Sequence, residues 1–557
     1  MSRCNSSALW EFFQKLDNEK KAKCNSCELN SFKTSIANLK THLKRKHLNA
    51  YITICNTQSR NSEQSCEQEH PAGDVKPQAS SSSDAASAST PAVTNSFTKK
   101  EEINDIEYIS LTTDLWTSRV NNAYIAITGH YLTKDLVLKT FLLKCAEFPD
   151  TDSSANIEDA LLETTNEWNV TNKINFIISD NAANIKKAIS NIGWKHYGCF
   201  GHTLNLIVQD ALHLVDASLD KVKTIVRYFK SSPAALEKLL KAQVHEKPDV
   251  TPKRLVQEVP TRWNSTLAML QRFVEIEDQI CATVAILKKD LPILTTEEWT
   301  MFHELCKVLK PFDEATKAMS GEDYMTASTI IVMTRCLKES CDQLLQEGFS
   351  VITNNIILAL RTGVDKRLEG VEKSGTFSIC TILDPRYKMN VFSDTNEAAK
   401  AKKTLEEKLA AIIRLRHEET QPQPSTSVSA SIPVRDKFSP FTILSNIVGT
   451  QQVKGTPLSR AIKEVDSYLK DDILPMFNDN GKFNCPLQWW RLNRHIYPNL
   501  AILLRKHGNI MATSVPCERI FSKTGLTINN RRTQLKTNKV AQLTYLNVNL
   551  DPKRFKI

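Results

Sequence analysis

The sequence predicts an α/β fold: a mixed sheet covered by helices, joined to a long helical region and preceded by a small metal-binding module. Between about residues 108 and 190, three strand patterns in a row are followed by helix, strand and helix, which is typical of a mixed sheet. From about 205 to 415, and again from 460 onward, apolar residues recur at helical spacing. Residues 1–50 gather cysteines, histidines and basic side chains.

Composition narrows the class of protein. The 557 residues are 41% hydrophobic and 24% charged, which is ordinary for a globular protein. No apolar run reaches the roughly 18 residues that a membrane helix needs, so we expect no membrane partner. The N-terminus lacks the apolar stretch of a secretory signal, and fourteen cysteines are too few for a disulfide scaffold. We therefore expect a reducing compartment. The net charge of +10 permits nucleic-acid binding.

Four candidate zinc ligands lie near the N-terminus in the pattern C-x2-C-x14-H-x4-H: Cys24, Cys27, His42 and His47. Zinc takes four sulfur or nitrogen ligands in a tetrahedron, and two cysteines at this spacing fit a tight knuckle. The histidines lie about one and a half helical turns apart, close enough to share one ion. Trp10, Phe12 and Phe13 would supply a small core. The sequence therefore predicts a module that folds around Zn2+.

The second half of this module is predicted to be an amphipathic helix. Ile36, Leu39 and Leu43 are spaced three and four apart. Its other faces carry four basic residues: Lys40, Lys44, Arg45 and Lys46. Residues 1–50 hold ten Lys or Arg against four Asp or Glu, so most of the net positive charge of the chain lies here. Basic side chains on one helix suit phosphate contacts, which predicts double-stranded DNA as the partner.

Two segments are predicted to be linkers. Residues 57–96 contain no aromatic residue, and the Ser/Ala-rich run at 79–92 follows neither a helical nor a strand period. Such a segment cannot bury a core and is expected to be disordered. Residues 420–432 are expected to form a second linker or exposed loop.

Two acids follow predicted strands. Tyr108–Thr113 reads as a strand ending at Asp114, and Ile174–Ser179 as a buried strand ending at Asp180. Between them, Ala123–Leu132 and a stretch from Leu136 read as strands. Open α/β sheets bind ligands beyond the carboxyl ends of their strands, where carboxylates can hold metal ions for phosphoryl transfer. An Asp after a strand also serves as a helix cap or turn former, and the spacing alone does not choose between these roles.

Several motifs in order resemble the hAT-type transposases and their domesticated BED-finger relatives. They are LTTDLWTS at 111–118, SDNAANIKKAI at 179–189, CFGHTLNLIVQDAL at 199–212, PTRWNST at 260–266, LDPRYK at 383–388 and a C-terminal stretch at 486–535. The finger resembles a BED domain. The resemblance covers nearly the whole chain outside the predicted linkers, and its C-terminal stretch is the most specific match.

The resemblance implies an RNase H-like mixed sheet core interrupted by a large α-helical insertion. By motif, Asp114, Asp180 and Glu518 match the acids of the family's catalytic triad, which would bind Mg2+ or Mn2+. Glu518 is expected in the first turn of a helix, after Ser514 as N-cap and with Pro516 in a tolerated position. The simpler alternative for Glu518 is complementation of the helix dipole.

Two further motifs resemble family signatures and have competing interpretations. Cys199 and His202 match a C-x-x-H motif that shapes the active site, or they are a buried thiol and a capping histidine. Arg262 and Trp263 match an RW pair that would contact DNA, with the arginine on a phosphate and the tryptophan on an unpaired base. The alternative is that Trp263 anchors the first insertion helix to the core.

The C-terminal stretch resembles the region through which the family dimerises, which implies a homo-oligomer. Trp489, Trp490 and the segment Leu500–Leu504 match it, and helix packing explains the same pattern equally well. The resemblance implies these domains: a BED-type zinc finger at 1–55, a linker at 56–100, the first part of the core at 101–212, an α-helical insertion at 213–480 with a flexible loop near 420–440, and core completion with the dimerisation region at 481–557.

Two functions follow from these observations. The first is a nuclear, zinc-dependent DNA-binding protein that derives from a hAT transposase and acts in transcription or chromatin regulation. The second is an active or recently degraded DNA transposase that uses an Asp-Asp-Glu, two-metal mechanism. The chain departs from the family in lacking an ordered segment ahead of the LTTD motif and a histidine within 147–157. Both departures favour the first function.

Overall fold

The computed structural model describes residues 13–15, 21–25, 32–33, 100–117, 122–148, 152–246, 249, 251–287, 289–420, 439–440, 443–444, 455–527 and 537–549. The chain divides into two compact units, residues 1–88 and 89–557, which are considered separately below. The predicted linker at 57–96 and the loop from 421 to 432 lie outside the described residues. Within the described ranges, no helix is both long and apolar enough to cross a membrane.

The N-terminal unit contains a small antiparallel sheet. Its strands are β1 (Phe13–Lys15), β2 (Lys21–Cys24) and β3 (Phe32–Lys33), in the order β1-β2-β3. Phe13 pairs with Cys24 across the first two strands, and both are buried, with 3% and 2% of their surfaces exposed. Phe13 therefore occupies the small core that the sequence predicts. The predicted helix that follows lies outside the described residues.

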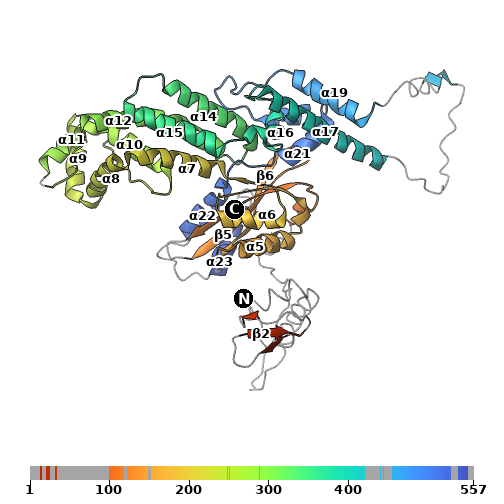
Figure 1. Ribbon diagram of the computed structural model, residues 1–557, viewed down its shortest axis with the longest axis horizontal. Coiled ribbons are helices and arrows are strands. Elements are labelled where there is room, and N and C mark those ends of the chain that lie inside the picture. Colours follow the sequence, from red (N-terminus) through yellow and green to blue (C-terminus); the bar gives the residue numbers. More distant parts are fainter. Residues whose placement is uncertain are drawn as a thin grey trace, which may run out of the picture. The chain divides into compact units, whose positions relative to one another are not determined.

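The second unit is built around a five-stranded mixed sheet of order β6-β5-β4-β7-β8 (Figure 1). Its strands are β4 (Ile109–Thr117), β5 (Ala123–Leu132), β6 (Leu138–Glu147), β7 (Ile174–Ser179) and β8 (His196–Gly198). The first three pair antiparallel, and β4, β7 and β8 run parallel. The predicted α/β fold with a mixed sheet is confirmed.

Strand β4 does not end at Asp114 as the sequence predicts. Its parallel pairing with β7 stops at Thr112, but its antiparallel pairing with β5 continues to Thr117, which lies opposite Ala123. Asp114 therefore lies within a strand, just past the point where its parallel neighbour ends. Strand β8 was not predicted, because three residues are too few to show an alternating pattern.

Four helices cover the sheet: α5 (Ser154–Glu167), α6 (Ala183–Ile192), α22 (Val515–Thr527) and α23 (Thr537–Asn549). Successive residues of a strand point to opposite faces. On β4, Leu111 joins the apolar cluster of α5 and α6, whereas Thr112 contacts Cys517 of α22. By this alternation, Asp114 shares the face of Thr112, which is the face that α22 covers.

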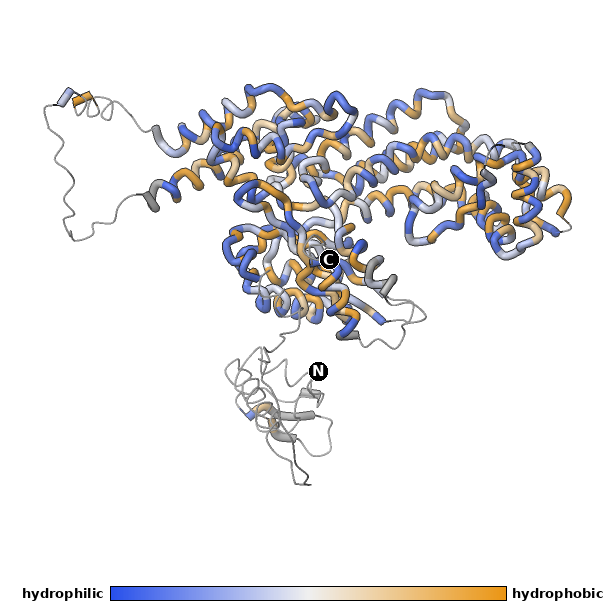
Figure 2. Tube along the Cα trace, turned by 180° about the vertical axis from the view of Figure 1, so that it is seen from behind, coloured by the Kyte–Doolittle hydropathy of each residue, from blue (hydrophilic) through white to orange (hydrophobic). Residues whose placement is uncertain are grey.

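The remaining helices form a separate apolar body, in which α7, α15 and α14 run side by side (Figure 1). Orange and blue stretches alternate along these helices in Figure 2, as expected for amphipathic helices. Its helices are α7 (Phe200–Leu212), α8 (Asp216–Ser231), α9 (Pro233–Glu246), α10 (Trp263–Glu275), α11 (Glu277–Ile286), α12 (Thr296–Val308), α13 (Lys310–Met319), α14 (Ile330–Leu344), α15 (Val351–Arg367), α16 (Phe377–Ile382), α17 (Thr395–Thr420), α19 (Pro457–Lys470), α20 (Pro486–Asn493) and α21 (Pro498–His507).

The LDPRYK motif is a buried polar joint within this helical body. The Asp384 carboxylate accepts hydrogen bonds from the Ser328 hydroxyl at 2.7 Å and from Nε and a terminal nitrogen of Arg386 at 2.9 and 2.7 Å. Lys388 adopts a positive φ of 49° and donates from Nζ to the carbonyl of Tyr468 at the end of α19. The motif therefore joins α14, α16 and α19.

Candidate active site

The sheet topology brings Asp114 and Asp180 together. Thr112 of β4 pairs with Ile178 of β7, so the same parallel register carried two residues further aligns the two aspartates. Asp180 follows β7, and its Oδ1 accepts a hydrogen bond from the backbone N–H of Ala182 at 3.2 Å, ahead of α6. Asp180 therefore fills the turn-forming role weighed in the sequence, and it does so at the edge where ligands bind in such sheets.

Glu518 reaches this edge from the far end of the chain. Helix α22 begins at Val515, with Pro516 and Glu518 in its first turn, as the sequence predicts. The helix is seated on the sheet by Cys517, whose Sγ donates to the carbonyl of Thr112 at 3.3 Å and is fully buried. The residue next to Glu518 is thus bound two positions from Asp114.

Cys199 fixes the chain that leads into α22. Its buried Sγ accepts the backbone N–H of His202 at 3.4 Å and that of Ser514 at 3.3 Å. The thiol is therefore the N-cap of α7 and also a tie between α7 and the start of α22. His202 is exposed, so the two residues do not share one buried helical face as the sequence was taken to predict.

A polar cluster under the acids escaped the sequence prediction. The buried His130 ring lies 3.2 Å from both Thr112 and Thr128 through Nε2, and 2.9 Å from Thr140 through Nδ1. Burial lowers the pKa of His130 to about 3, so the ring is neutral at physiological pH. Alternating Thr and His in the two strands is the signal that could have pointed to this cluster.

The three acids affect one another electrostatically. Burial raises the pKa of Asp114 to about 8, and the charges of Glu518 and then Asp180 raise it further toward that value. The backbone N–H of Leu115, which donates to Oδ1 at 3.0 Å, and the charge of Arg262 partly oppose this shift. Both other acids are therefore close enough to Asp114 to repel its charge.

Arg262 binds the third acid. Its guanidinium donates to Oε2 of Glu518 at 2.8 Å, and the two side chains are 61% and 38% exposed. Arg262 directly precedes α10, so a residue of the helical body reaches the edge of the sheet. Arg519 makes a parallel link, because it pairs with Glu322 and donates to the carbonyl of Ser320. The first turn of α22 is thus held from the helical side.

A divalent metal fits the chemistry of this set of donors. Three carboxylates are hard oxygen ligands of the kind that Mg2+ and Mn2+ prefer, and mutual repulsion is the property that a cation would relieve. Across the described ranges, no group of three or more His, Cys, Asp or Glu side chains is arranged to hold a metal ion. Glu518 is instead neutralised by Arg262, so metal ligation by all three acids requires that ion pair to open.

Trp263 does not have the surface that base stacking requires. Only 1% of it is exposed, and its backbone N–H donates to Oδ1 of Asn205 on α7. This burial contradicts the prediction that the ring contacts DNA and favours the alternative, in which Trp263 anchors α10 to the rest of the body. Arg262 remains accessible beside it.

Most of the predicted finger residues lie outside the described residues. Cys24 lies at the end of β2 and is buried. The other three predicted zinc ligands and the four predicted basic contacts fall on undescribed positions: Cys27, His42, His47, Lys40, Lys44, Arg45 and Lys46.

The residues expected at a dimer seam are largely packed inside this chain. Trp490 is fully buried and donates from Nε1 to the carbonyl of Leu383 at 2.8 Å. Leu500 and Leu504 are also buried, and Trp489 is partly buried against them. Helix packing therefore accounts for this pattern, and any contact between copies must use other side chains.

Four family models match parts of the chain. A BED zinc finger matches residues 7–48, the ZBED1 RNase-like domain 112–196, the ZBED1 RNase-like helical domain 197–308, and the hAT family C-terminal dimerisation region 464–550. The matches to the RNase-like domain and its helical partner cover the sheet and the helices that follow it.

Curated relatives resemble the chain along most of its length. Human "Zinc finger BED domain-containing protein 4" is 25% identical over 79% of this chain and 37% of its own length. "Putative AC transposase" of Zea mays is 25% identical over 76% of this chain and 54% of its own. "Putative transcriptional regulator tpeD" of Talaromyces stipitatus is 24% identical over 78% and 53%. The chain spans about half of these relatives or less.

Proposed function

Because the chain carries a BED zinc finger, ZBED-type RNase-like domains and a hAT dimerisation region, and is homologous to ZBED proteins and AC transposases, we propose that it is a nuclear DNA-binding protein. Its binding depends on zinc, and it acts in transcription or chromatin regulation. The relative named as a transcriptional regulator supports this role.

The observation that carries the proposal is the finger. Cys24, Cys27, His42 and His47 fall within the matched residues 7–48 and have the donor types of a closed structural zinc site. Zinc, when bound, supplies folding energy that so small a core lacks. The predicted helix then presents four basic residues to the phosphates of duplex DNA.

Occupancy of chromatin tests this function. The tagged full chain is expressed in cells beside the variant Cys24→Ser/Cys27→Ser, and DNA bound in nuclei is sequenced. We expect discrete sites for the wild-type chain, loss of these sites in the variant, and altered transcripts from neighbouring genes. A wild-type chain that is excluded from nuclei, or identical occupancy by both proteins, would refute the proposal.

A second function, DNA transposase, is favoured by the clustering of the acids. Asp114, Asp180 and Glu518 would hold Mg2+ or Mn2+, which when bound stabilises the attacking and leaving oxygens of a phosphoryl transfer. Burial and its acidic neighbours keep Asp114 protonated near neutrality, so the site carries less negative charge until a cation enters. Arg262, released from Glu518, would be free to contact a phosphate of the DNA end.

Cleavage distinguishes the second function from the first. The full chain is incubated with Mn2+ and duplexes that carry the sequences flanking its own gene, and strand breaks are mapped. Transposase activity predicts breaks at the ends of inverted repeats that disappear in Asp180→Asn. A regulator without cleavage activity predicts bound but intact DNA for both proteins. Equal cleavage by both proteins would exclude the acids from the reaction.

A further inference from the structure

Two lysines from distant parts of the sequence meet at the amino ends of the parallel strands. Lys195 directly precedes β8, and its carbonyl accepts the backbone N–H of Ile177 on β7 at 2.9 Å. Lys506 lies near the end of α21, and its carbonyl accepts from the side chain of Asn175, two residues earlier on β7. Its Nζ lies 5.2 Å from the ring centre of Tyr108, directly ahead of β4.

A third lysine joins them from the helical body. Lys408 is on α17, which packs against α21. Helix α16 makes contact at the same point, because Cys380 donates from Sγ to the carbonyl of His507 at 3.4 Å. Burial, followed by the charges of Lys195 and Lys506, lowers the pKa of Lys408. Lys506 has its pKa lowered by burial and then by Lys195. The three ammonium groups are therefore near enough to repel one another.

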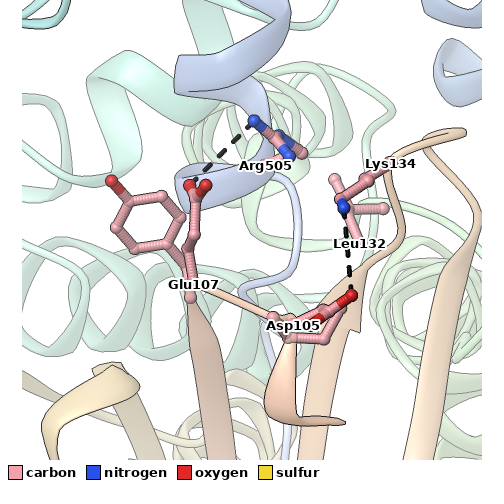
Figure 3. A pocket seen from close by; sticks show the side chains of 7 residues that line it. Asp105, Glu107, Leu132, Lys134 and Arg505 are labelled. Atoms are coloured by element: carbon pink, nitrogen blue, oxygen red, sulfur yellow. Dashed lines mark ion pairs between the residues drawn. The ribbon is translucent and has the colours of Figure 1, made fainter. Parts of the chain in front are cut away.

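No carboxylate compensates these charges. Among the residues that the structure describes, Lys195, Lys408 and Lys506 form no ion pair, and Lys195 and Lys506 are exposed. The adjacent pocket shows the opposite pattern (Figure 3): Arg505 lies 4.0 Å from Glu107, and Lys134 lies 4.0 Å from Asp105. Basic residues next to the cluster are thus paired, while the cluster keeps three positive charges for an anion from outside.

We propose that Lys195, Lys408 and Lys506, here called the lysine cluster, bind the phosphodiester backbone of duplex DNA. This inference rests on the proposed DNA-binding function and adds a second contact to that of the finger. Lysine ammonium groups are point charges that hold phosphates without reading base sequence. Three of them, contributed by a loop, α17 and α21, suit a polyanion that runs across several elements.

The lysine cluster is distinct from the acidic site. Asp114 and Asp180 lie at the carboxyl end of the parallel strands, whereas Lys195 and Asn175 lie at their amino end. Six residues of β7 separate the two edges, which is about 20 Å at the rise of an extended strand. That span corresponds to about six base pairs of B-form DNA. The lysine cluster therefore holds DNA away from the acids.

The test measures binding without the finger. In the full chain carrying Cys24→Ser/Cys27→Ser, affinity for a fluorescent duplex of arbitrary sequence is measured across a salt series. Adding Lys195→Gln, Lys408→Gln and Lys506→Gln should weaken binding at least about tenfold and reduce the salt slope by about 2–3. A matched control removes three charges elsewhere: Lys134→Gln, Lys241→Gln and Lys400→Gln. It should leave both quantities near their starting values.

Further arms fix the interpretation. The triple replacement by arginine should retain the affinity, and the triple Gln variant should unfold at the same temperature as its parent or slightly higher, because repulsion is relieved. Equal weakening by the cluster and control variants would overturn the proposal, as would unweakened binding by the cluster variant. Competition by inorganic phosphate as strong as that by duplex DNA would overturn it in favour of a small-anion site. If the finger itself does not bind DNA, the wild type and the finger variant bind alike, an outcome separate from all of these.

Discussion

Asp114 shows how one residue can be suited to a site and costly to the fold. Its raised pKa means that the folded protein holds a proton that the unfolded chain has released. Such a group stabilises the fold fully below the unfolded pKa near 3.9, and this contribution is lost as pH rises toward about 8. Acidic sites kept for function commonly carry this kind of cost.

Asp114→Asn should therefore stabilise the metal-free protein at pH 8 by about 1–3 kcal/mol, and much less at pH 4. Urea unfolding at the two pH values measures the difference. Asp479→Asn, at an exposed loop position, is the matched control and should change stability by less than about 0.5 kcal/mol. A variant less stable than wild type at pH 8 would show that the Asp114 carboxylate is favourably solvated or paired there.

His507 predicts acid sensitivity. Both ring nitrogens are buried without a hydrogen-bond partner in the described part of the chain, and burial lowers the pKa to about 3. As pH falls below the unfolded value near 6.5, only the unfolded chain gains this proton, so stability falls by about 1.4 kcal/mol per pH unit. His507→Leu should flatten the acid limb of the stability curve between pH 6.5 and 4.5. His495→Leu, at an exposed position, should leave the limb unchanged, and equal slopes for all three proteins would contradict the assignment.

Single residues also show what could be predicted from the sequence. Asp180 follows from strand pattern alone, and Asp114 from the same rule with an error in where the strand ends. Arg262 and Glu518 are 256 residues apart, so their ion pair depends on how the helical body packs against the sheet. The lysine cluster has the same origin, since no local pattern joins residues 195, 408 and 506.

At the level of elements, long patterned segments were predicted well and short ones were not. Strands β5 and β7 match their predicted bounds because each is a continuous apolar or alternating run. Strand β8 has only three residues, and β4 extends past its apolar part through pairing with β5. Tertiary pairing, rather than local propensity, decides such ends.

The joint formed by LDPRYK should be the most sensitive polar element of the helical body. Asp384→Ala leaves the buried Arg386 guanidinium without its partner and the Ser328 hydroxyl without its acceptor. We expect a loss of about 3–5 kcal/mol in the free energy of unfolding. Asp135→Ala breaks the exposed pair with Arg494 and should cost less than about 1 kcal/mol. Similar costs in chemical denaturation would show that burial does not set the strength of the joint.

For the whole molecule, we expect a homo-oligomer formed through the C-terminal region. Because Trp490 and its neighbours are buried, the contact needs exposed apolar residues within 464–550. Phe477 and Phe483 are 52% and 58% exposed, with ring centres 4.6 Å apart. A second copy is the occupant that the matched dimerisation region favours.

Phe477→Ser/Phe483→Ser should therefore weaken self-association at least about tenfold in sedimentation, with little change in unfolding temperature. The control variant, Ile293→Ser/Val351→Ser, alters two residues that are 81% and 80% exposed outside this region and should associate as the wild type does. A monomeric wild-type chain, or a double Phe variant that still associates fully, would contradict the prediction.

The order of motifs predicted the α/β core and the helical body of the whole molecule, because each segment has a strong periodic pattern. It did not predict that the body would hold the first turn of α22 through Arg262 and Arg519. Contacts of this kind depend on the angle between packed elements, which no local pattern encodes.

The most direct test of the central claim is the affinity of the full chain for duplex DNA with and without an intact finger. Fluorescence anisotropy at one fixed salt concentration compares the zinc-loaded wild type with Cys24→Ser/Cys27→Ser and with wild type treated with a chelator. We predict that affinity falls at least about tenfold in both cases, while the unfolding temperature of the second unit stays the same. Unchanged affinity after loss of the finger would contradict the account and place DNA binding in the body of the protein.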